Sequence, residues 1–117
     1  MSTVESISAL TLATHDMARA LAFYQSLGLD VIHGDADAPF CSLRAGSGYV
    51  NLALSVDKSW SWWGRAVFYV GDVDAMHQRA LAAGYAPDTT PRDAEWGERY
   101  FHITDPDGHE LSFARPL

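Results

Sequence analysis

The sequence has a single cysteine, few basic residues and no long hydrophobic run, and each shortage excludes a class of protein. Cys41, standing alone, can form neither a disulfide within the chain nor a CxxC zinc or redox motif, which is typical of a reducing compartment. No stretch of about 18 apolar residues and no basic run before an apolar segment signals membrane insertion or export. We therefore expect a cytoplasmic protein.

Basic residues are also scarce relative to acidic ones. Eight Lys and Arg against 15 Asp and Glu give a formal charge of −7, which repels nucleic acid phosphates and anionic membranes. A neutral or cationic small molecule is the easier partner, although solubility alone also accounts for an acidic surface. We expect no nucleic acid and no membrane partner.

What is present is a folded composition that repeats itself. The 117 residues, 48% hydrophobic and 20% charged, predict one domain over 1–117. The segments Asp16–Gly28 and Asp72–Gly84 are equally long and share an acidic start, a periodic apolar interior and a terminal glycine. Both predict short helices, because aspartate caps the first turn and glycine ends the last. The apolar faces are Met17, Ala20, Leu21, Tyr24 and Leu27 in the first, and Val73, Met76, Ala80 and Ala83 in the second.

Strand patterns surround both helices and predict the order β-α-β-β-β twice, in modules of about 6–56 and 64–115. The turn Asp105-Pro-Asp-Gly108 indicates a hairpin between the last two strands, with Gly108 left-handed. The predicted strands are 7–13, 29–33, 40–44 and 49–56 in the first module, and 65–70, 85–86, 99–104 and 109–114 in the second.

One helix can cover only one face of each sheet, so the other face is available for a ligand or another chain. Alternation assigns the helix side to Leu10, Leu12, Val50, Leu52, Phe68, Val70, Leu111 and Phe113. The opposite, more polar face takes Ala9, Thr11, Tyr49, Asn51, Arg65, Tyr69, Glu110 and Ser112, with Tyr100 and His102 joining them if the hairpin has its bulge.

Several motifs of the two halves form one recognisable set: Leu12-Ala-Thr-His-Asp16, Ala22-Phe-Tyr24 and Leu27-Gly28, followed by Trp96-Gly97, Arg99, Phe101 and Asp105-Pro-Asp-Gly108. This set resembles the vicinal oxygen chelate superfamily, which includes glyoxalases, bleomycin resistance proteins and extradiol dioxygenases. The group of motifs from Trp96 to Gly108 is similar to the bleomycin resistance branch. The resemblance implies an α+β fold of two tandem βαβββ modules forming an eight-stranded open cup, with the helices on the outer face and commonly as a homodimer.

In metal-dependent members, four ligands line the cup. The matching positions here are Ala9, Asn51, Arg65 and Ser112, and alanine, a permanent cation and neutral oxygens bind transition metals poorly. We therefore expect no standard metal site, no cofactor and no catalytic residue. The alternative is a metal-dependent lyase, isomerase or dioxygenase with a non-standard site, built on His102 and Glu110 facing each other across the final hairpin.

The run Ser59-Trp-Ser-Trp-Trp-Gly64 joins the modules, and with Trp96 it could sandwich a planar group. Such tryptophans are equally suited to a dimer interface or the base of the cup. We predict the binding and sequestration of an aromatic small molecule, neutral or cationic, as in antibiotic resistance. Tryptophans would stack, Glu110 would meet a positive group and Arg65 would orient an oxygen. The predicted ligand-binding residues are Trp60, Trp62, Trp63, Trp96, Tyr49, Asn51, Arg65, Tyr69, Tyr100, His102 and Glu110.

The remaining candidate nucleophiles and bases indicate no catalysis. Cys41 lies in an apolar strand pattern, which favours a structural role. His15, His33, His77 and His109 are predicted to be surface or capping residues.

Overall fold

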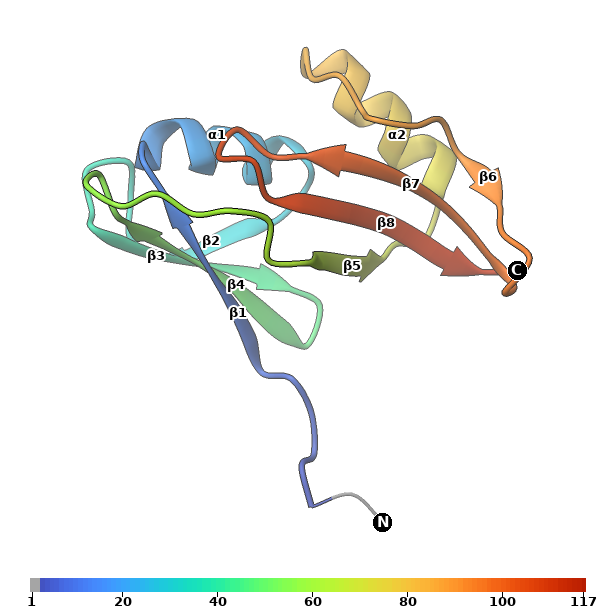
Figure 1. Cartoon of the computed structure of the whole chain (residues 1–117), viewed down its shortest axis with the longest axis horizontal. Coiled ribbons are helices and arrows are strands. Elements are labelled where there is room, and N and C mark those ends of the chain that lie inside the picture. Colours follow the sequence, from blue (N-terminus) through green and yellow to red (C-terminus); the bar gives the residue numbers. More distant parts are fainter. Residues whose placement is uncertain (1–2) are drawn as a thin grey trace. The chain divides into compact units, whose positions relative to one another are not determined.

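The computed structural model describes residues 3–117 and divides into two compact units, one up to Lys58 and one from Ser59. We call them module 1 and module 2. Each contains one helix and one four-stranded sheet in the order β-α-β-β-β (Figure 1), so the predicted α+β class and the duplication are confirmed.

Module 1 has the sheet order β1-β4-β3-β2, in which β1 and β4 are parallel and the other neighbours antiparallel. Helix α1 contacts β4 and covers one face. Its elements are β1 (Ala9–Thr14), α1 (Met17–Ser26), β2 (Asp30–His33), β3 (Phe40–Ala45) and β4 (Gly48–Leu54).

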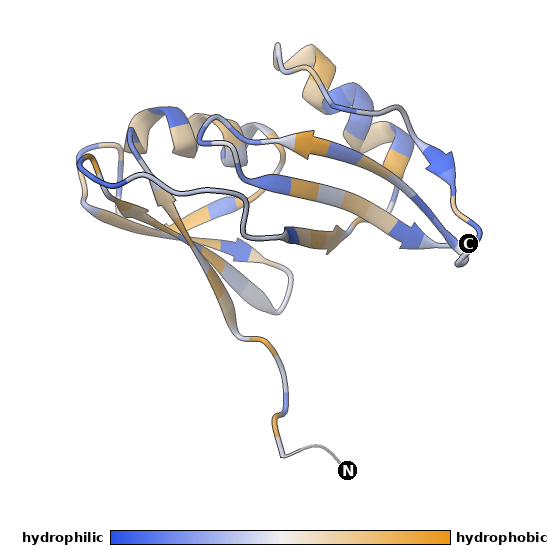
Figure 2. Ribbon diagram, in the orientation of Figure 1, coloured by the Kyte–Doolittle hydropathy of each residue, from blue (hydrophilic) through white to orange (hydrophobic). Residues whose placement is uncertain are grey.

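Module 2 repeats this topology with the order β5-β8-β7-β6 and a parallel β5–β8 pair. Helix α2 contacts β7 and β8, and hydrophobic and hydrophilic residues alternate along these strands (Figure 2). Its elements are β5 (Arg65–Tyr69), α2 (Val73–Ala82), β6 (Arg92–Asp93), β7 (Glu98–Thr104) and β8 (Glu110–Pro116).

Both helices begin and end as predicted. The carboxylates of Asp16 and Asp72 accept hydrogen bonds from the backbone N–H groups of Arg19 and Ala75, at 3.1 and 2.9 Å. Gly28 and Gly84 have φ angles of 95° and 91°, the left-handed conformation that terminates a helix. No helix in the described part of the chain is long and apolar enough to span a bilayer.

The predicted stripe of α1 is buried, with Phe23 buried in addition, whereas the buried stripe of α2 differs from the prediction. In α2 the buried residues are Val73, His77 and Ala80, whereas Ala83 is exposed. The prediction that His77 is a surface residue is wrong: its ring packs edge-on against Phe101 on β7, with centroids 5.1 Å apart. His77 is buried because Val73, His77 and Ala80 are spaced i, i+4 and i+7 and therefore lie on one face of the helix.

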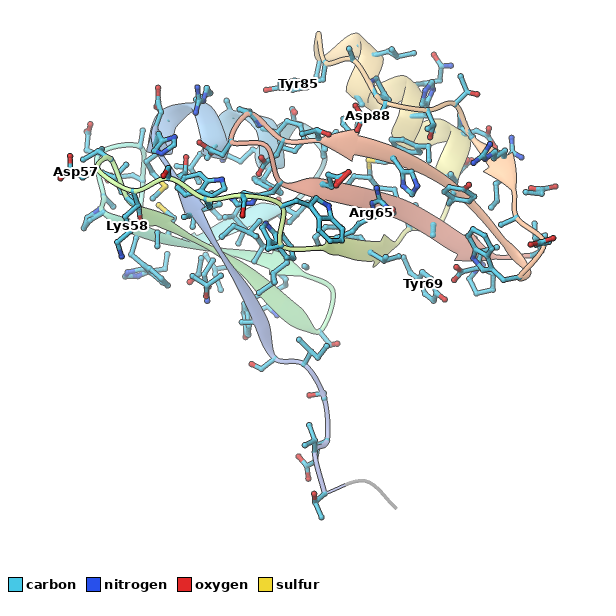
Figure 3. The ribbon with its side chains drawn as sticks, in the orientation of Figure 1. Asp57, Lys58, Arg65, Tyr69, Tyr85 and Asp88 are labelled. Carbon is cyan, nitrogen blue, oxygen red and sulfur yellow. The ribbon has the colours of Figure 1, made fainter. Side chains whose placement is uncertain are left out.

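The predicted strand at Tyr85 and Ala86 is absent, and this is a correction. The backbone N–H of Tyr85 instead donates to Ala80 O, which completes the end of α2. The chain then runs beside β7, where Asp88 N donates to His102 O at 2.8 Å, and it pairs as β6 only at Arg92–Asp93. Tyr85 and Asp88 are labelled on this connection in Figure 3.

The last hairpin is confirmed, with a small change at its end. Gly108 N donates to Asp105 O at 3.0 Å, and Gly108 has a φ of 88°. His109 belongs to the turn, so β8 starts at Glu110. The register pairs Tyr100 with Ala114 and His102 with Ser112, which places Tyr100 and His102 on the sheet face away from α2, as predicted.

Candidate functional site

A cavity of about 220 Å³ lies over the face of the module 2 sheet that α2 leaves uncovered. The strand register explains its composition, because alternate residues of β5, β8 and β7 share this face. Its lining residues are Arg65, Val67, Trp96, Glu98, Tyr100, His102, Ser112 and Ala114.

One wall of the cavity is aromatic and apolar. Trp96 is 65% exposed, and its ring lies 5.4 Å from that of Tyr100, with a tilt of 33° between the planes. Tyr100 is itself nearly buried, and its hydroxyl accepts a hydrogen bond from Arg92 Nε at 2.8 Å. Val67 adds an exposed aliphatic side chain from β5. A flat apolar group can therefore be covered on this side by ring and methyl surfaces.

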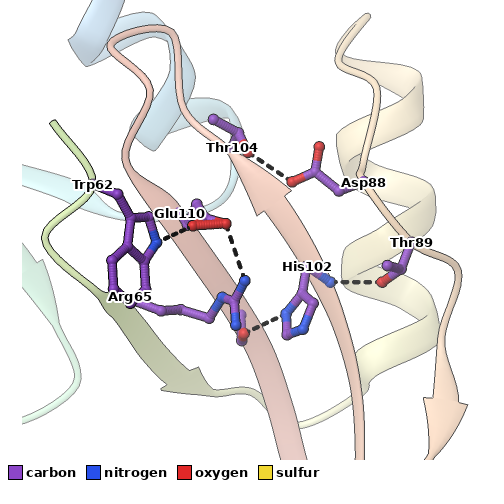
Figure 4. A network of polar contacts seen from close by, with 8 residues as sticks. Trp62, Arg65, Asp88, Thr89, His102, Thr104 and Glu110 are labelled. Atoms are coloured by element: carbon purple, nitrogen blue, oxygen red, sulfur yellow. Dashed lines mark hydrogen bonds and ion pairs between the residues drawn. The ribbon is translucent and has the colours of Figure 1, made fainter.

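The opposite wall carries a fixed cation. Arg65, at the start of β5 (Figure 3), forms an ion pair with Glu110 at 3.1 Å, and the indole N–H of Trp62 donates to the other oxygen of the same carboxylate (Figure 4). Both charged side chains are about one-third exposed, so the pair contributes little to stability. The ion pair instead neutralises the charge of Arg65 and holds its guanidinium at the cavity.

His102 provides a neutral polar group between the two walls. Its Nδ1 lies 2.6 Å from the hydroxyl of Ser112, and its backbone N–H donates to Thr89 Oγ1 at 2.9 Å (Figure 4). Burial, and next the positive charge of Arg65, lower the pKa of His102 below its ordinary value. The imidazole is therefore uncharged near neutral pH and can donate or accept one hydrogen bond through Nε2.

Glu98 is a cavity residue that the sequence analysis missed. Trp96 Nε1 donates to its Oε1 at 3.0 Å, and the Tyr69 hydroxyl donates to its Oε2. This bond to a carboxylate raises the pKa of Tyr69, so the phenol keeps its proton. The signal that could have found Glu98 is parity, because it lies two residues before Tyr100 on the same strand face.

Trp60 and Trp63 lie at the 105–109 turn, Trp62 bonds to Glu110, and none of the three is among the lining residues of the cavity. Trp60 stacks on His109 at 5.5 Å and donates to Asp107 O, and Trp63 Nε1 donates to His109 Nδ1 at 2.6 Å. His109 is only 4% exposed, so its assignment to the surface is wrong. The cause is these two indoles, which come from 46 or more positions earlier in the chain and which no local pattern reveals.

The other two predicted ligand-binding residues, Tyr49 and Asn51, lie on the corresponding face of module 1. Arg44 lies over the Tyr49 ring, 5.0 Å from its centre. Asn51 accepts a hydrogen bond from Ser42 at 2.7 Å and donates to Thr11 at 3.2 Å. The structure therefore brings Trp96, Arg65, Tyr100 and His102 together at the cavity, with Trp62, Tyr69 and Glu110 bonded at its edge.

The residues at the family's ligand positions do not fit a divalent cation. Ala9 has no donor atom, Arg65 is a cation, and the oxygens of Asn51 and Ser112 already have hydrogen-bonding partners. His102 and Glu110 share a sheet face, but their cross-strand partners are Ser112 and Thr104, not each other. Over residues 3–117 no group of three or more His, Cys, Asp or Glu side chains could hold a metal ion.

The duplicated β-α-β-β-β topology places the chain in the class of paired βαβββ proteins. The chain belongs to the Glyoxalase/Bleomycin resistance protein/Dioxygenase superfamily, whose family model matches residues 6–113. A curated relative, the uncharacterized protein Mb0911c of Mycobacterium bovis, is 48% identical over 48 residues. That match covers 41% of this chain and 32% of the relative.

Several solved structures have the same fold, and the names of two of them state different functions. TioX from Micromonospora sp. ML1 is 25% identical with a TM-score of 0.79, covering 97% of this chain and 100% of that one. A bleomycin resistance determinant of transposon Tn5 is 18% identical (TM-score 0.79; 96% and 98%). A lactoylglutathione lyase from Agrobacterium tumefaciens is 19% identical (TM-score 0.78; 97% and 95%). The last two likenesses concern the fold alone.

Proposed function

We propose that the protein binds and sequesters an aromatic small molecule in the module 2 cavity, without transforming it. The observation that carries this proposal is the exposed ring of Trp96 beside Tyr100 and Val67, facing a fixed Arg65 and a neutral His102. Such a site offers ring stacking and a few hydrogen bonds, which give affinity and orientation. A function in antibiotic resistance would also agree with the name of one solved structure of the same fold, the bleomycin resistance determinant of transposon Tn5.

The chemistry of the donor set supports binding over catalysis. The enzymatic alternative requires a metal ion acting as a Lewis acid, and the residues at the ligand positions that the resemblance implies do not fit one. The polar side chains at the cavity form closed pairs, Arg65 with Glu110 and His102 with Ser112. These pairs hold the side chains in fixed orientations, which favours positioning a ligand.

Titration of planar aromatic compounds, followed by calorimetry and by tryptophan fluorescence, tests the proposal. We expect saturable binding that is weakened about fivefold or more by Trp96→Ala, since ring stacking contributes about 1 kcal/mol or more. Trp60→Phe is the matched control, because Trp60 contacts the 105–109 turn and not the cavity. Stoichiometric bound metal that disappears in His102→Ala or Glu110→Ala, together with turnover sensitive to EDTA, would establish the enzymatic alternative instead.

We also propose that the protein is a homodimer. The cavity of about 220 Å³ is smaller than the roughly 300–1,000 Å³ of pockets that enclose drug-sized molecules. Val67, Tyr69 and Trp96 are each more than half exposed around it, and such apolar surface favours burial by a second copy. Sedimentation equilibrium measures the mass directly, and a monomer at all concentrations would contradict this proposal.

A further inference from the structure

Glu98 differs from the other charged side chain of the cavity in its partners. The positive charge of Arg65 is compensated by Glu110. The Glu98 carboxylate receives only neutral donors, the indole of Trp96 and the hydroxyl of Tyr69. No lysine, arginine or histidine in the described chain lies within ion-pair distance of Glu98. Glu98 is therefore a carboxylate at the cavity that no ion pair among the described residues compensates.

The two donors of Glu98 are also the most exposed aromatic residues beside it. Trp96 and Tyr69 are both 65% exposed, and each is oriented by its bond to the same carboxylate. Ring faces attract cations, and a half-exposed carboxylate with spare lone pairs adds direct Coulomb attraction. Arg92 illustrates this preference nearby, because its guanidinium lies over the Tyr100 ring, 5.3 Å from the centre.

Resting on the proposed function, we propose that Glu98, Trp96 and Tyr69 form a subsite for the positive nitrogen of the ligand. We call it the Glu98 subsite. The rings of Trp96 and Tyr69 attract a cation through their faces, which require no hydrogen bond from it, so the subsite suits a cation that has no hydrogen bonds to donate. The ligand class is thus an aromatic compound with an alkylated ammonium or a delocalised heteroaromatic cation.

This assignment replaces the role that the sequence analysis expected for Glu110. Glu110 forms an ion pair with Arg65 and accepts a hydrogen bond from the indole of Trp62. A ligand cation at Glu110 would have to compete with a guanidinium of the same chain, whereas at Glu98 it meets an uncompensated carboxylate.

Three probes separate the subsite from general aromatic binding. They are 1-methylquinolinium, an aromatic cation; quinoline, which is uncharged at neutral pH; and tetramethylammonium, a cation with no ring. Calorimetry gives the affinities of the first two. Binding of tetramethylammonium is followed by proton NMR of the Trp96 indole N–H. This resonance is assigned by its absence from the spectrum of Trp96→Phe.

Glu98→Gln is the test variant, and Glu95→Gln is its matched control because Glu95 is an exposed acid three positions away. We expect Glu98→Gln to lower the affinity for 1-methylquinolinium about tenfold and the affinity for quinoline less than twofold. Glu95→Gln should change neither affinity. Tetramethylammonium should shift the Trp96 resonance in the parent protein and not in Glu98→Gln. Glu98→Asp keeps the charge on a shorter side chain and should also lower the affinity for 1-methylquinolinium.

The outcomes distinguish the two proposals. Equal losses for Glu98→Gln and Glu95→Gln, or no loss for either, would overturn the Glu98 subsite while leaving quinoline binding as support for the proposed function. If neither quinoline nor 1-methylquinolinium binds, the proposed function is contradicted. The tetramethylammonium shift then decides the subsite alone: a shift that needs Glu98 supports it, and no shift overturns it.

Discussion

Each tryptophan of the chain donates its single indole N–H to a defined acceptor. This matters because one bond is enough to orient the whole ring, even where the ring is largely exposed, as in Trp62 and Trp96. Two of the acceptors are carboxylates at the cavity and two belong to the 105–109 turn. The pairs are Trp62 with Glu110, Trp96 with Glu98, Trp60 with Asp107 and Trp63 with His109.

At the residue scale, His102 makes the stability of the protein depend on pH. Its pKa is lowered in the folded state by burial and by Arg65, so the unfolded chain binds the proton more readily. The free energy of unfolding should therefore be constant above about pH 6.5, the ordinary value for histidine, and decrease as the pH falls through the folded pKa.

Urea unfolding at a series of pH values measures this dependence. His102→Gln should flatten the part of the profile just below pH 6.5, whereas Ser112→Ala leaves the histidine to titrate. A profile with the same slope in the parent and in His102→Gln would show that other groups cause it.

At the scale of single elements, the two cap aspartates are equivalent and should cost the same when removed. Asp16→Ala and Asp72→Ala each leave one backbone N–H of the first helical turn without its partner. We expect each variant to lose about 1 kcal/mol in the free energy of unfolding, measured with urea. Glu95→Ala, in an exposed loop, is the control and should change it by less than about 0.5 kcal/mol.

The hairpin turn gives a second prediction at this scale. An added Cβ at Gly108 meets no atom within 4 Å, so the effect of Gly108→Ala is purely that of its φ of 88°. We expect a loss of about 1–2 kcal/mol. Gly71 has equally open surroundings but no left-handed φ, and Gly71→Ala should be neutral or slightly stabilising. Equal effects at both glycines would refute a conformational origin.

Elements with local signals were predictable from the sequence, and those determined by distant contacts were not. The helices, their caps and the last hairpin follow from residues within a few positions of each other. The first strand after α2 was misplaced, because the chain at Asp88 bonds to β7 through His102 O and pairs as β6 only at Arg92–Asp93. His77 and His109 are buried by Phe101 and by Trp60, partners far away in the chain.

The candidate site divides in the same way. Strand parity correctly grouped Arg65, Tyr100 and His102 on one sheet face. It could not show that the 60–63 tryptophans turn toward the 105–109 turn, because an irregular segment has no periodicity to follow. Glu98 was overlooked although the parity of β7 included it.

At the scale of the whole molecule, the formal charge of −7 should assist the capture of a cation over distance. The affinity for 1-methylquinolinium should therefore fall as sodium chloride is added, since the Debye length shortens to about 8 Å at physiological ionic strength. Calorimetric titrations at several salt concentrations measure the effect, and quinoline should show none. An affinity for the cation that is independent of salt would mean that local contacts alone provide the attraction.

The bonds from Trp96 and Tyr69 to Glu98, and from Trp62 to Glu110, exist before any ligand arrives. The binding surface is thus preorganised, and little conformational entropy has to be lost upon association. Ligand capture should follow a single kinetic phase, with a heat-capacity change set by the area that the ligand covers. The same rigidity limits the range of ligands that can bind. Rings held in one orientation select flat, stiff molecules and adapt poorly to flexible ones.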